Sequence, residues 1–90
     1  MRELEFREKV KIWREEFGAV IFDILEEKVF ATNQTGADIL DLMDEGKTEQ
    51  EIVSALKDKY SKGSQRIAQD VSNFIIRLQD NGFLRSGDSG

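Results

Sequence analysis

The chain has 90 residues, of which 39% are hydrophobic and 34% are charged, and its formal net charge is −5. This length suits a single domain with a modest core, too small to enclose a deep catalytic pocket. The chain has no Cys and no His, which excludes disulfides, thiol and imidazole catalysis and the usual zinc and haem ligands, so we expect no cofactor.

The first part of the chain predicts a lead-in followed by a strand. Residues 1–9 carry many charges and follow no clear apolar period. In residues 10–14 apolar and charged side chains alternate, as they do in a strand with one buried face. Trp13 breaks this alternation, so its side chain is expected on the other face of the strand.

Two further strands follow the first. Residues 19–24 are β-branched or aromatic over most of the run, which predicts a central strand that is buried on both faces. Residues 25–28 fit a four-residue hairpin loop, and residues 29–32 then form a short third strand. We therefore expect a three-stranded antiparallel sheet.

The first predicted helix covers residues 36–43. Asn33 precedes it as a helix N-cap, and Thr35 is a second candidate if the helix starts later. Gly36 fits a close turn from strand to helix. The helix ends near Gly46, because glycine readily takes the left-handed backbone angles of a C-cap.

Two more helices complete the predicted fold. Thr48 and Glu51 form a capping box that opens the second helix, since each side chain can satisfy a backbone N–H of the other residue. Gly82 ends the third helix, and residues 85–90 are interpreted as a flexible tail. The third helix has the clearest apolar face, made of Ile67, Val71, Phe74, Ile75 and Leu78.

The chain resembles the PqqD family over residues 10–84. The most specific part of the resemblance is the Asn-x-Thr-Gly junction between the third strand and the first helix, residues 33–36. Residues 17–23, 29–36 and 39–43, the capping box with Ile52, Val53 and Leu56, and the stretch from Asp70 to Leu84 match the family's landmarks in order.

The resemblance implies an α+β, winged-helix-like fold in which a three-stranded antiparallel sheet is followed by three helices, with residues 10–84 as the domain. It implies a non-catalytic domain that holds the leader segment of a precursor of ribosomally synthesised and post-translationally modified peptides (RiPPs). The leader adds a strand beside the third strand and against the third helix, so that main-chain hydrogen bonds supply affinity and side-chain pockets supply selectivity. The domain then delivers the leader to a modifying enzyme, commonly a radical SAM protein.

One departure concerns the pathway. Family members dedicated to the synthesis of pyrroloquinoline quinone (PQQ) often carry a Pro-Glu pair in the turn after the second strand. This chain has no Pro, and its turn is formed by residues 25–28. The resemblance therefore supports the peptide-carrying role and does not assign the PQQ pathway.

The candidate peptide-binding residues lie on the third strand and on one flank of the third helix. An edge strand offers unpaired backbone groups, and small or apolar side chains on a helix flank let a peptide approach closely. Asp70 lies on the other flank and is interpreted as structural, whereas Trp13 is either core or a peptide anchor. The candidates are Val29, Phe30, Ala31, Thr32, Ala68, Ser72, Ile75 and Ile76.

Other functions stay open as alternatives. A winged-helix protein can place a helix in the major groove of DNA, but residues 16–56 carry ten acidic groups against two basic ones, and the third helix has only Arg66 and Arg77. We therefore expect no nucleic-acid binding. A protein–protein adaptor is the second alternative, and a small acid–base enzyme is disfavoured because His and Cys are lacking.

Location and assembly follow from what the sequence lacks. No apolar run approaches the ~20 residues that span a bilayer, and no early run has the pattern of a signal peptide, so we expect a cytoplasmic protein without membrane contact. The acidic pairs at residues 26–27 and 44–45 lack the regular spacing of a calcium loop and predict no metal site. An uncovered sheet edge can pair with its own copy, which leaves a homo-oligomer open.

Overall fold

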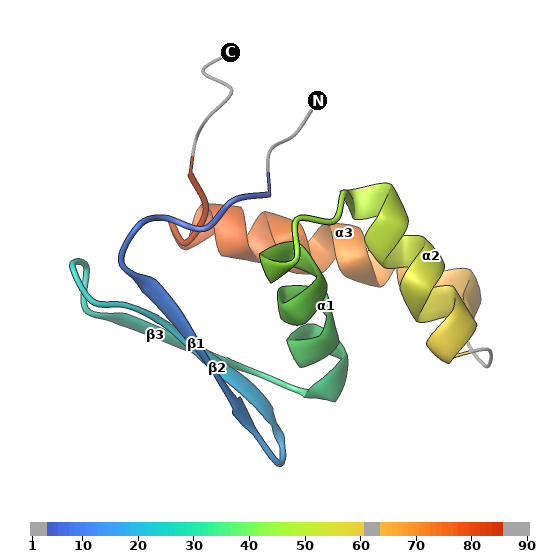
Figure 1. The fold of residues 1–90 in the computed structure, drawn as a ribbon, viewed down its shortest axis with the longest axis horizontal. Helices are drawn as coiled ribbons and strands as arrows, with labels where there is room; N and C mark the ends of the chain where they lie inside the picture. Colours follow the sequence, from blue (N-terminus) through green and yellow to red (C-terminus); the bar gives the residue numbers. More distant parts are fainter. Residues whose placement is uncertain (1–3, 61–63, 86–90) are drawn as a thin grey trace.

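The computed structural model describes residues 4–60 and 64–85 (Figure 1). Its three strands precede its three helices, which confirms the predicted α+β order. The elements are β1 (Val10–Glu15), β2 (Gly18–Asp23), β3 (Lys28–Thr32), α1 (Gln34–Asp44), α2 (Glu49–Lys59) and α3 (Ser64–Asp80). Among the described residues, no helix is both long and apolar enough to cross a membrane.

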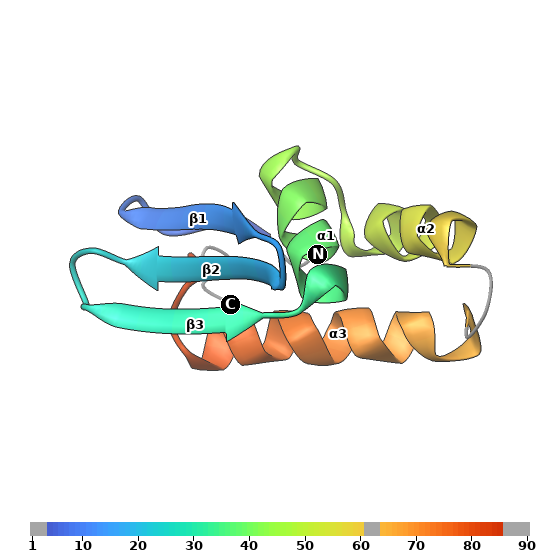
Figure 2. The same cartoon turned by 90° about the horizontal axis from the view of Figure 1, so that it is seen from below.

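The sheet is antiparallel throughout, with strand order β1-β2-β3. α1 contacts β2 and β3, α2 contacts α1 and α3, and an aromatic contact joins α3 to β3. Figures 1 and 2 show all three helices on the same side of the sheet. The molecule therefore has two layers, and its core lies between the inner face of the sheet and the helices.

The central strand β2 is buried on one face only, so the prediction of burial on both faces is wrong. Ala19 and Ile21 on its inner face are fully buried, whereas Val20 and Phe22 on its outer face are half-buried. The outer face has no covering layer among the described elements. The neighbouring strand β1 partly shields this face, because the ring centroids of Trp13 and Phe22 lie 4.7 Å apart.

The junction between β3 and α1 is held by local interactions that the sequence predicted. The Asn33 side chain accepts a hydrogen bond of 2.9 Å from the backbone N–H of Gly36, so Asn33 is the N-cap and α1 begins two residues earlier than expected. A Cβ added at Gly36 would lie 1.8 Å from Thr32 Oγ1 and 3.0 Å from Phe74 Cε1. Glycine is therefore what lets α1 start directly against β3 and α3.

The predicted signals at the other helix ends are also confirmed. Thr48 and Glu51 form the capping box of α2, with hydrogen bonds of 3.1 Å and 2.8 Å between side chain and backbone. Gly82 follows α3 with a φ of 79°, in the left-handed region. The backbone then turns so that Phe83 donates its N–H to the carbonyl of Leu78 and buries its ring in the core.

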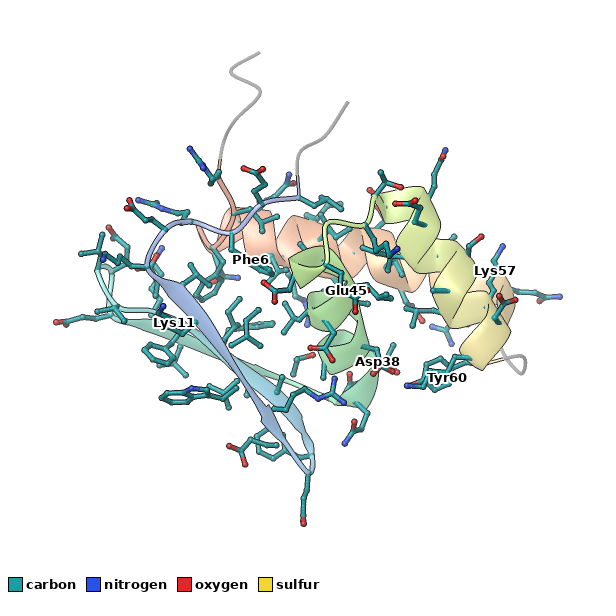
Figure 3. All side chains as sticks on the ribbon, viewed as in Figure 1. Phe6, Lys11, Asp38, Glu45, Lys57 and Tyr60 are labelled. Atoms are coloured by element: carbon teal, nitrogen blue, oxygen red, sulfur yellow. The ribbon has the colours of Figure 1, made fainter. Side chains whose placement is uncertain are left out.

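The described part of the lead-in, residues 4–9, joins the domain at its C-terminal end. Phe6 forms a β-bridge with Leu84, and the N–H of Arg7 donates to the Phe83 carbonyl over 3.0 Å. Figure 3 places the Phe6 side chain beside the end of α3, and Phe6 packs against the core. Apart from Arg85, whose N–H bonds the Glu5 carbonyl, the predicted flexible tail lies outside the described residues.

Candidate functional site

The candidate site begins with β3, which is an edge strand as expected. It pairs with β2 on one side, and on its other side no strand among residues 4–60 and 64–85 pairs with it. In an antiparallel strand alternate residues turn their N–H and C=O groups to opposite sides, so β3 has backbone donors and acceptors along its open side. It has five residues and no Pro, which leaves this edge free to accept another strand.

The side chains of β3 divide between the two faces of the sheet. Phe30 and Thr32 point to the inner face and are half-buried. The centroid of the Phe30 ring lies 6.3 Å from the ring centroids of both Phe74 and Phe83. Val29 and Ala31 lie on the outer face, where Val29 is 73% exposed. A strand added to β3 would thus meet α3 on one face and open solvent on the other.

A groove opens where β3 and α3 separate. Figure 1 shows that the two elements diverge toward the end of β3. The Lys28 ammonium donates to the Asn81 carbonyl over 2.9 Å at one end, and Phe30 packs against Phe74 further along. Beyond these contacts lies a cavity of about 370 Å³, lined by Thr32, Asn33, Thr35, Gly36, Ile39, Asp70, Asn73, Phe74 and Arg77.

The α3 wall of this groove is not the flank that the sequence analysis chose. Asp70, Asn73 and Arg77 line the groove, whereas Ala68, Ser72 and Ile76 do not. Residues along a helix advance by roughly 100°, which places these two sets on opposite sides of the core stripe. Periodicity identified both flanks but carries no information on which of them faces β3, so it could not decide between them.

Ile75 needs a separate correction. Its side chain is fully buried in the core, so it offers no surface to a ligand in this structure. Ala68 is exposed, Ser72 is half-buried, and Ile76 is 41% exposed on the side of α3 away from the core. Of the eight candidates, Thr32 alone lines the groove, and Val29, Phe30 and Ala31 lie on the strand beside it.

The polar residues of the α3 wall are available to a ligand. In the described part of the chain, no hydrogen bond or ion pair engages the side chains of Asp70, Asn73 or Arg77, so no polar side-chain contact accounts for the structural role predicted for Asp70. These residues and Phe74 follow the spacing i, i+3, i+4 and i+7, which marks one face of a helix. This spacing is the sequence signal that could have identified the side of α3 that lines the groove.

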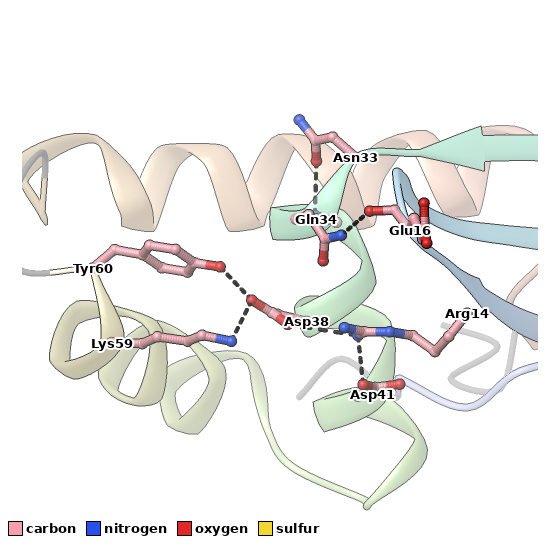
Figure 4. A network of polar contacts seen from close by, with 9 residues as sticks. Arg14, Glu16, Asn33, Gln34, Asp38, Asp41, Lys59 and Tyr60 are labelled. Carbon is pink, nitrogen blue, oxygen red and sulfur yellow. Dashed lines mark hydrogen bonds and ion pairs between the residues drawn. The ribbon is translucent and has the colours of Figure 1, made fainter.

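Asp38 forms a polar network on another side of α1 (Figure 4). Its carboxylate, 9% exposed as a residue, accepts hydrogen bonds from the Tyr60 hydroxyl and the Lys59 ammonium and lies 3.5 Å from the Arg14 guanidinium. Burial alone would raise the pKa of Asp38, but the two hydrogen bonds and the two positive charges outweigh it and lower that pKa. The network links β1, α1 and α2, and all three contacts engage the Asp38 carboxylate within the fold.

Trp13 does not belong to the core. It is 57% exposed on the outer face of the sheet, where its ring packs at a tilt against that of Phe22. The alternative that placed it in the core is therefore wrong. It also lies on β1, at the sheet edge opposite β3, so it does not line the groove.

Comparison with known proteins gives a family match and two similar structures. The family model for coenzyme PQQ synthesis protein D (PqqD) matches residues 18–84. TbiB1, solved in complex with the TbiA(beta) leader peptide, has a TM-score of 0.82 and 23% identity, covering 96% of this chain and 99% of its own. Lasso peptide synthetase B1, complexed with the leader peptide, has a TM-score of 0.77 and 19% identity over 88% and 93% of the two chains.

Among curated proteins, none matches this sequence. The two structural matches have too little identity to show more than a shared fold, and that fold is the three strands and three helices described above. The family match is independent of them. It begins with β2, includes the strand-to-helix junction at Asn33 and runs through the turn after α3, so the chain belongs to the PqqD family.

Proposed function

We propose that this chain binds the leader segment of a ribosomally synthesised precursor peptide as an added strand on β3 and presents it to a peptide-modifying enzyme. The observation that carries this proposal is the open edge of β3 next to a groove walled by α3. Membership of the PqqD family supports it. The two similar structures were each solved with a leader peptide, which supports the same role here.

The geometry suits recognition of an extended peptide. Backbone groups on the open side of β3 bond the peptide main chain whatever its sequence, and this supplies affinity. Side chains on one face of the added strand then point toward the groove and meet the apolar Phe74 and the polar Asp70, Asn73 and Arg77. Selectivity comes from this alternate set of peptide side chains, because only they reach the groove.

We infer a carrier role and no catalysis by the domain itself. The sequence has neither His nor Cys, the usual bases and nucleophiles near neutral pH. The ionisable groups that line the groove are Asp70 and Arg77, both exposed, and the buried Asp38 is engaged by three neighbours. The chemistry is therefore assigned to a partner enzyme working with this domain in the cytoplasm.

The proposal extends to the class of the modifying enzyme. The family resemblance favours a radical SAM enzyme, and the absence of the Pro-Glu turn leaves the product unassigned between PQQ and other RiPPs. Genes that neighbour this one provide the test, since a short precursor gene beside a radical SAM gene would support the assignment. A neighbouring ATP-dependent cyclase in place of a radical SAM gene would contradict it.

Peptide binding is tested by calorimetry with the leader segment of the precursor encoded beside this chain. We expect a dissociation constant at the micromolar level, as a short added strand with a few side-chain contacts provides. Ala31→Pro should weaken binding at least about tenfold, because proline removes an N–H and places a ring on the strand. Ala31→Val is the matched control, since it keeps the N–H and suits a strand.

The thermal unfolding of both variants must be compared with that of the parent chain. A weakened Ala31→Pro variant that unfolds at an unchanged temperature would locate binding at the β3 edge. Absence of any heat and of any NMR shift changes with the cognate leader would overturn the carrier proposal.

A further inference from the structure

We propose that the helix-free outer face of the sheet is the surface on which the modifying enzyme docks, and that a bound peptide strand enlarges it. The inference rests on the proposed function in identifying the partner as the enzyme that acts on the peptide. The outer face consists of the outward side chains of the three strands, namely Lys11, Trp13, Glu15, Val20, Phe22, Val29 and Ala31.

Six of these side chains form two cross-strand rows, and Glu15 stands at the end of β1. The strand register sets Trp13 opposite Val20 and Val20 opposite Ala31, and it sets Lys11, Phe22 and Val29 in the next row. Five of these six side chains are apolar. Trp13 is 57% and Val29 73% exposed, and Trp13 packs on Phe22 at 4.7 Å between ring centroids. A contiguous exposed apolar patch of this kind marks an interaction site, whereas scattered single residues do not.

The hairpin turns carry further exposed apolar side chains. Phe17, in the turn between β1 and β2, is 56% exposed. Ile24 and Leu25, in the turn between β2 and β3, are 50% and 66% exposed. Among the described residues, the exposed large apolar side chains thus lie on the sheet or in its hairpin turns, apart from Ile76 on α3.

The charged side chains at the two ends of the sheet indicate the kind of partner. Glu15 and Glu16 are exposed at the β1–β2 turn, and Glu26 and Glu27 are exposed at the β2–β3 turn. Lys11 lies on the outer face next to the β2–β3 end, so the uncompensated acidic end is the β1–β2 turn. Two copies that met at this turn would oppose acidic side chains, which costs free energy, whereas a protein whose apolar patch is bordered by basic side chains meets attraction there. The occupant is therefore a different protein of that surface chemistry.

The two rows lead directly to the open edge of β3. A strand added there continues both rows, because its outward side chains stand next to Val29 and Ala31. The loaded domain then presents a wider apolar surface than the empty one. The enzyme should consequently bind the loaded domain more tightly, and by thermodynamic reciprocity it should tighten peptide binding by the same factor.

The test measures binding of the peptide-modifying enzyme encoded beside this chain to the domain loaded with its leader peptide. Trp13→Ser should weaken enzyme binding at least about tenfold, because it removes the largest side chain of the outer face. Ile76→Ser is the matched control, because Ile76 is a comparably exposed apolar residue on α3 and lies off the sheet. Equal enzyme affinity for both variants would overturn the docking surface.

A second variant tests the charge argument without altering any apolar contact. Glu16→Lys combined with Glu26→Lys should weaken the enzyme complex several-fold at low salt and reduce its salt dependence. Tighter enzyme binding by this variant would overturn the choice of a basic-bordered partner. Sedimentation of the parent chain adds an independent check, since a dimer that Trp13→Ser dissociates would identify a second copy as the occupant and overturn the proposal.

Failure of this inference is distinguishable from failure of the proposed function. Trp13 lies on β1, away from the β3 edge, so Trp13→Ser should leave the affinity for the leader peptide unchanged. Peptide binding with no loss of enzyme binding in Trp13→Ser would overturn the docking surface alone. Enzyme binding that needs Trp13 while no leader peptide binds would retain the surface and overturn the carrier role.

Discussion

The ring centroids of Phe30 and Phe74 lie 6.3 Å apart, and this contact joins the middle of β3 to α3. The Phe83 ring, which follows α3, lies at the same distance from Phe30 on another side. β3 and α3 share no ladder of backbone hydrogen bonds, so aromatic packing sets the width of the space between them. The groove beside the edge strand therefore depends on this cluster.

Removing the Phe30 ring should affect both stability and binding. Phe30→Ala should lower the free energy of unfolding by ~2 kcal/mol, less than the ~3–5 kcal/mol of a fully buried Phe, because the ring is half-buried. Leader affinity should fall as well, since α3 loses its contact with β3. Urea denaturation and calorimetry measure the two effects. Val29→Ala on the outer face should change stability by less than ~0.5 kcal/mol, and equal losses in both variants would contradict the assigned role.

Gly36 should tolerate no side chain. In the parent chain Gly36→Ala places a methyl group 1.8 Å from Thr32 Oγ1, so we expect a loss of ~2–3 kcal/mol in unfolding free energy despite the better helix propensity of Ala. In a Thr32→Ala background the same change should cost less, because the hydroxyl is gone. A double-mutant cycle by denaturation measures this coupling. Additive losses would show that the Thr32 hydroxyl is not the obstacle.

The two flanks of α3 can be separated by a matched pair of variants. Asn73→Arg places a long side chain in the groove and should weaken leader binding at least about fivefold, whereas Ala68→Arg on the opposite flank should leave it unchanged. Both positions are exposed on the same helix, so the two proteins should unfold at similar temperatures. A loss of binding in Ala68→Arg alone would restore the flank that the sequence analysis chose.

The Asp38 network should make stability depend on pH at both extremes. The pKa of Asp38 is lowered in the folded state, so its stabilising contribution is present above the ordinary value of 3.8 and is lost as the pH falls through the lowered value. The pKa values of Tyr60 and Lys59 are raised by their hydrogen bonds to Asp38, so their contributions are present below the ordinary values of 10.0 and 10.5 and are lost as the pH rises further.

Replacement of Asp38 tests this dependence. Asp38→Asn should lower the melting temperature at pH 7, and the gap to the parent chain should begin to narrow below about pH 4 and close as the pH falls through the lowered pKa of Asp38. Thermal melts between pH 3 and pH 7 measure the gap. Asp58→Asn, at an exposed position of α2 that has no ion pair among the described residues, should show no comparable gap. A gap that does not narrow at all between pH 4 and pH 3 would mean that the amide disrupts packing and not charge pairing.

Local signals in the sequence predicted most of the fold. The Asn33 cap, the capping box of Thr48 and Glu51 and the glycine after α3 each act over a few residues, so the chain around them decides their conformation. The apolar stripe of α3 likewise identifies which face of that helix is buried. Burial of β2 was mispredicted because an apolar run shows that side chains avoid water but does not show which face receives the helices.

The sequence predicted the candidate site only in part, because a local pattern does not show how the elements pack against one another. That β3 could be an edge followed from the order of the elements and its lack of Pro. The flank of α3 that faces β3 depends on how α1 and α3 pack around Phe30 and Gly36, and this is a tertiary relationship. Small size indicated Ala68 and Ser72 as candidates, whereas polar residues such as Asn73 at helical spacing usually form a solvated face and give no comparable signal.

The bridge between Phe6 and Leu84 has a consequence for tethering. Because residues 5–7 and 83–85 are held side by side, a linker attached near either end of the domain would leave from the same place. The effective concentration of a partner enzyme fused to the domain would then be set by the length of the linker and would hardly depend on the order of the two proteins in the fusion. Fusions in both orders should consequently modify the same precursor at similar rates.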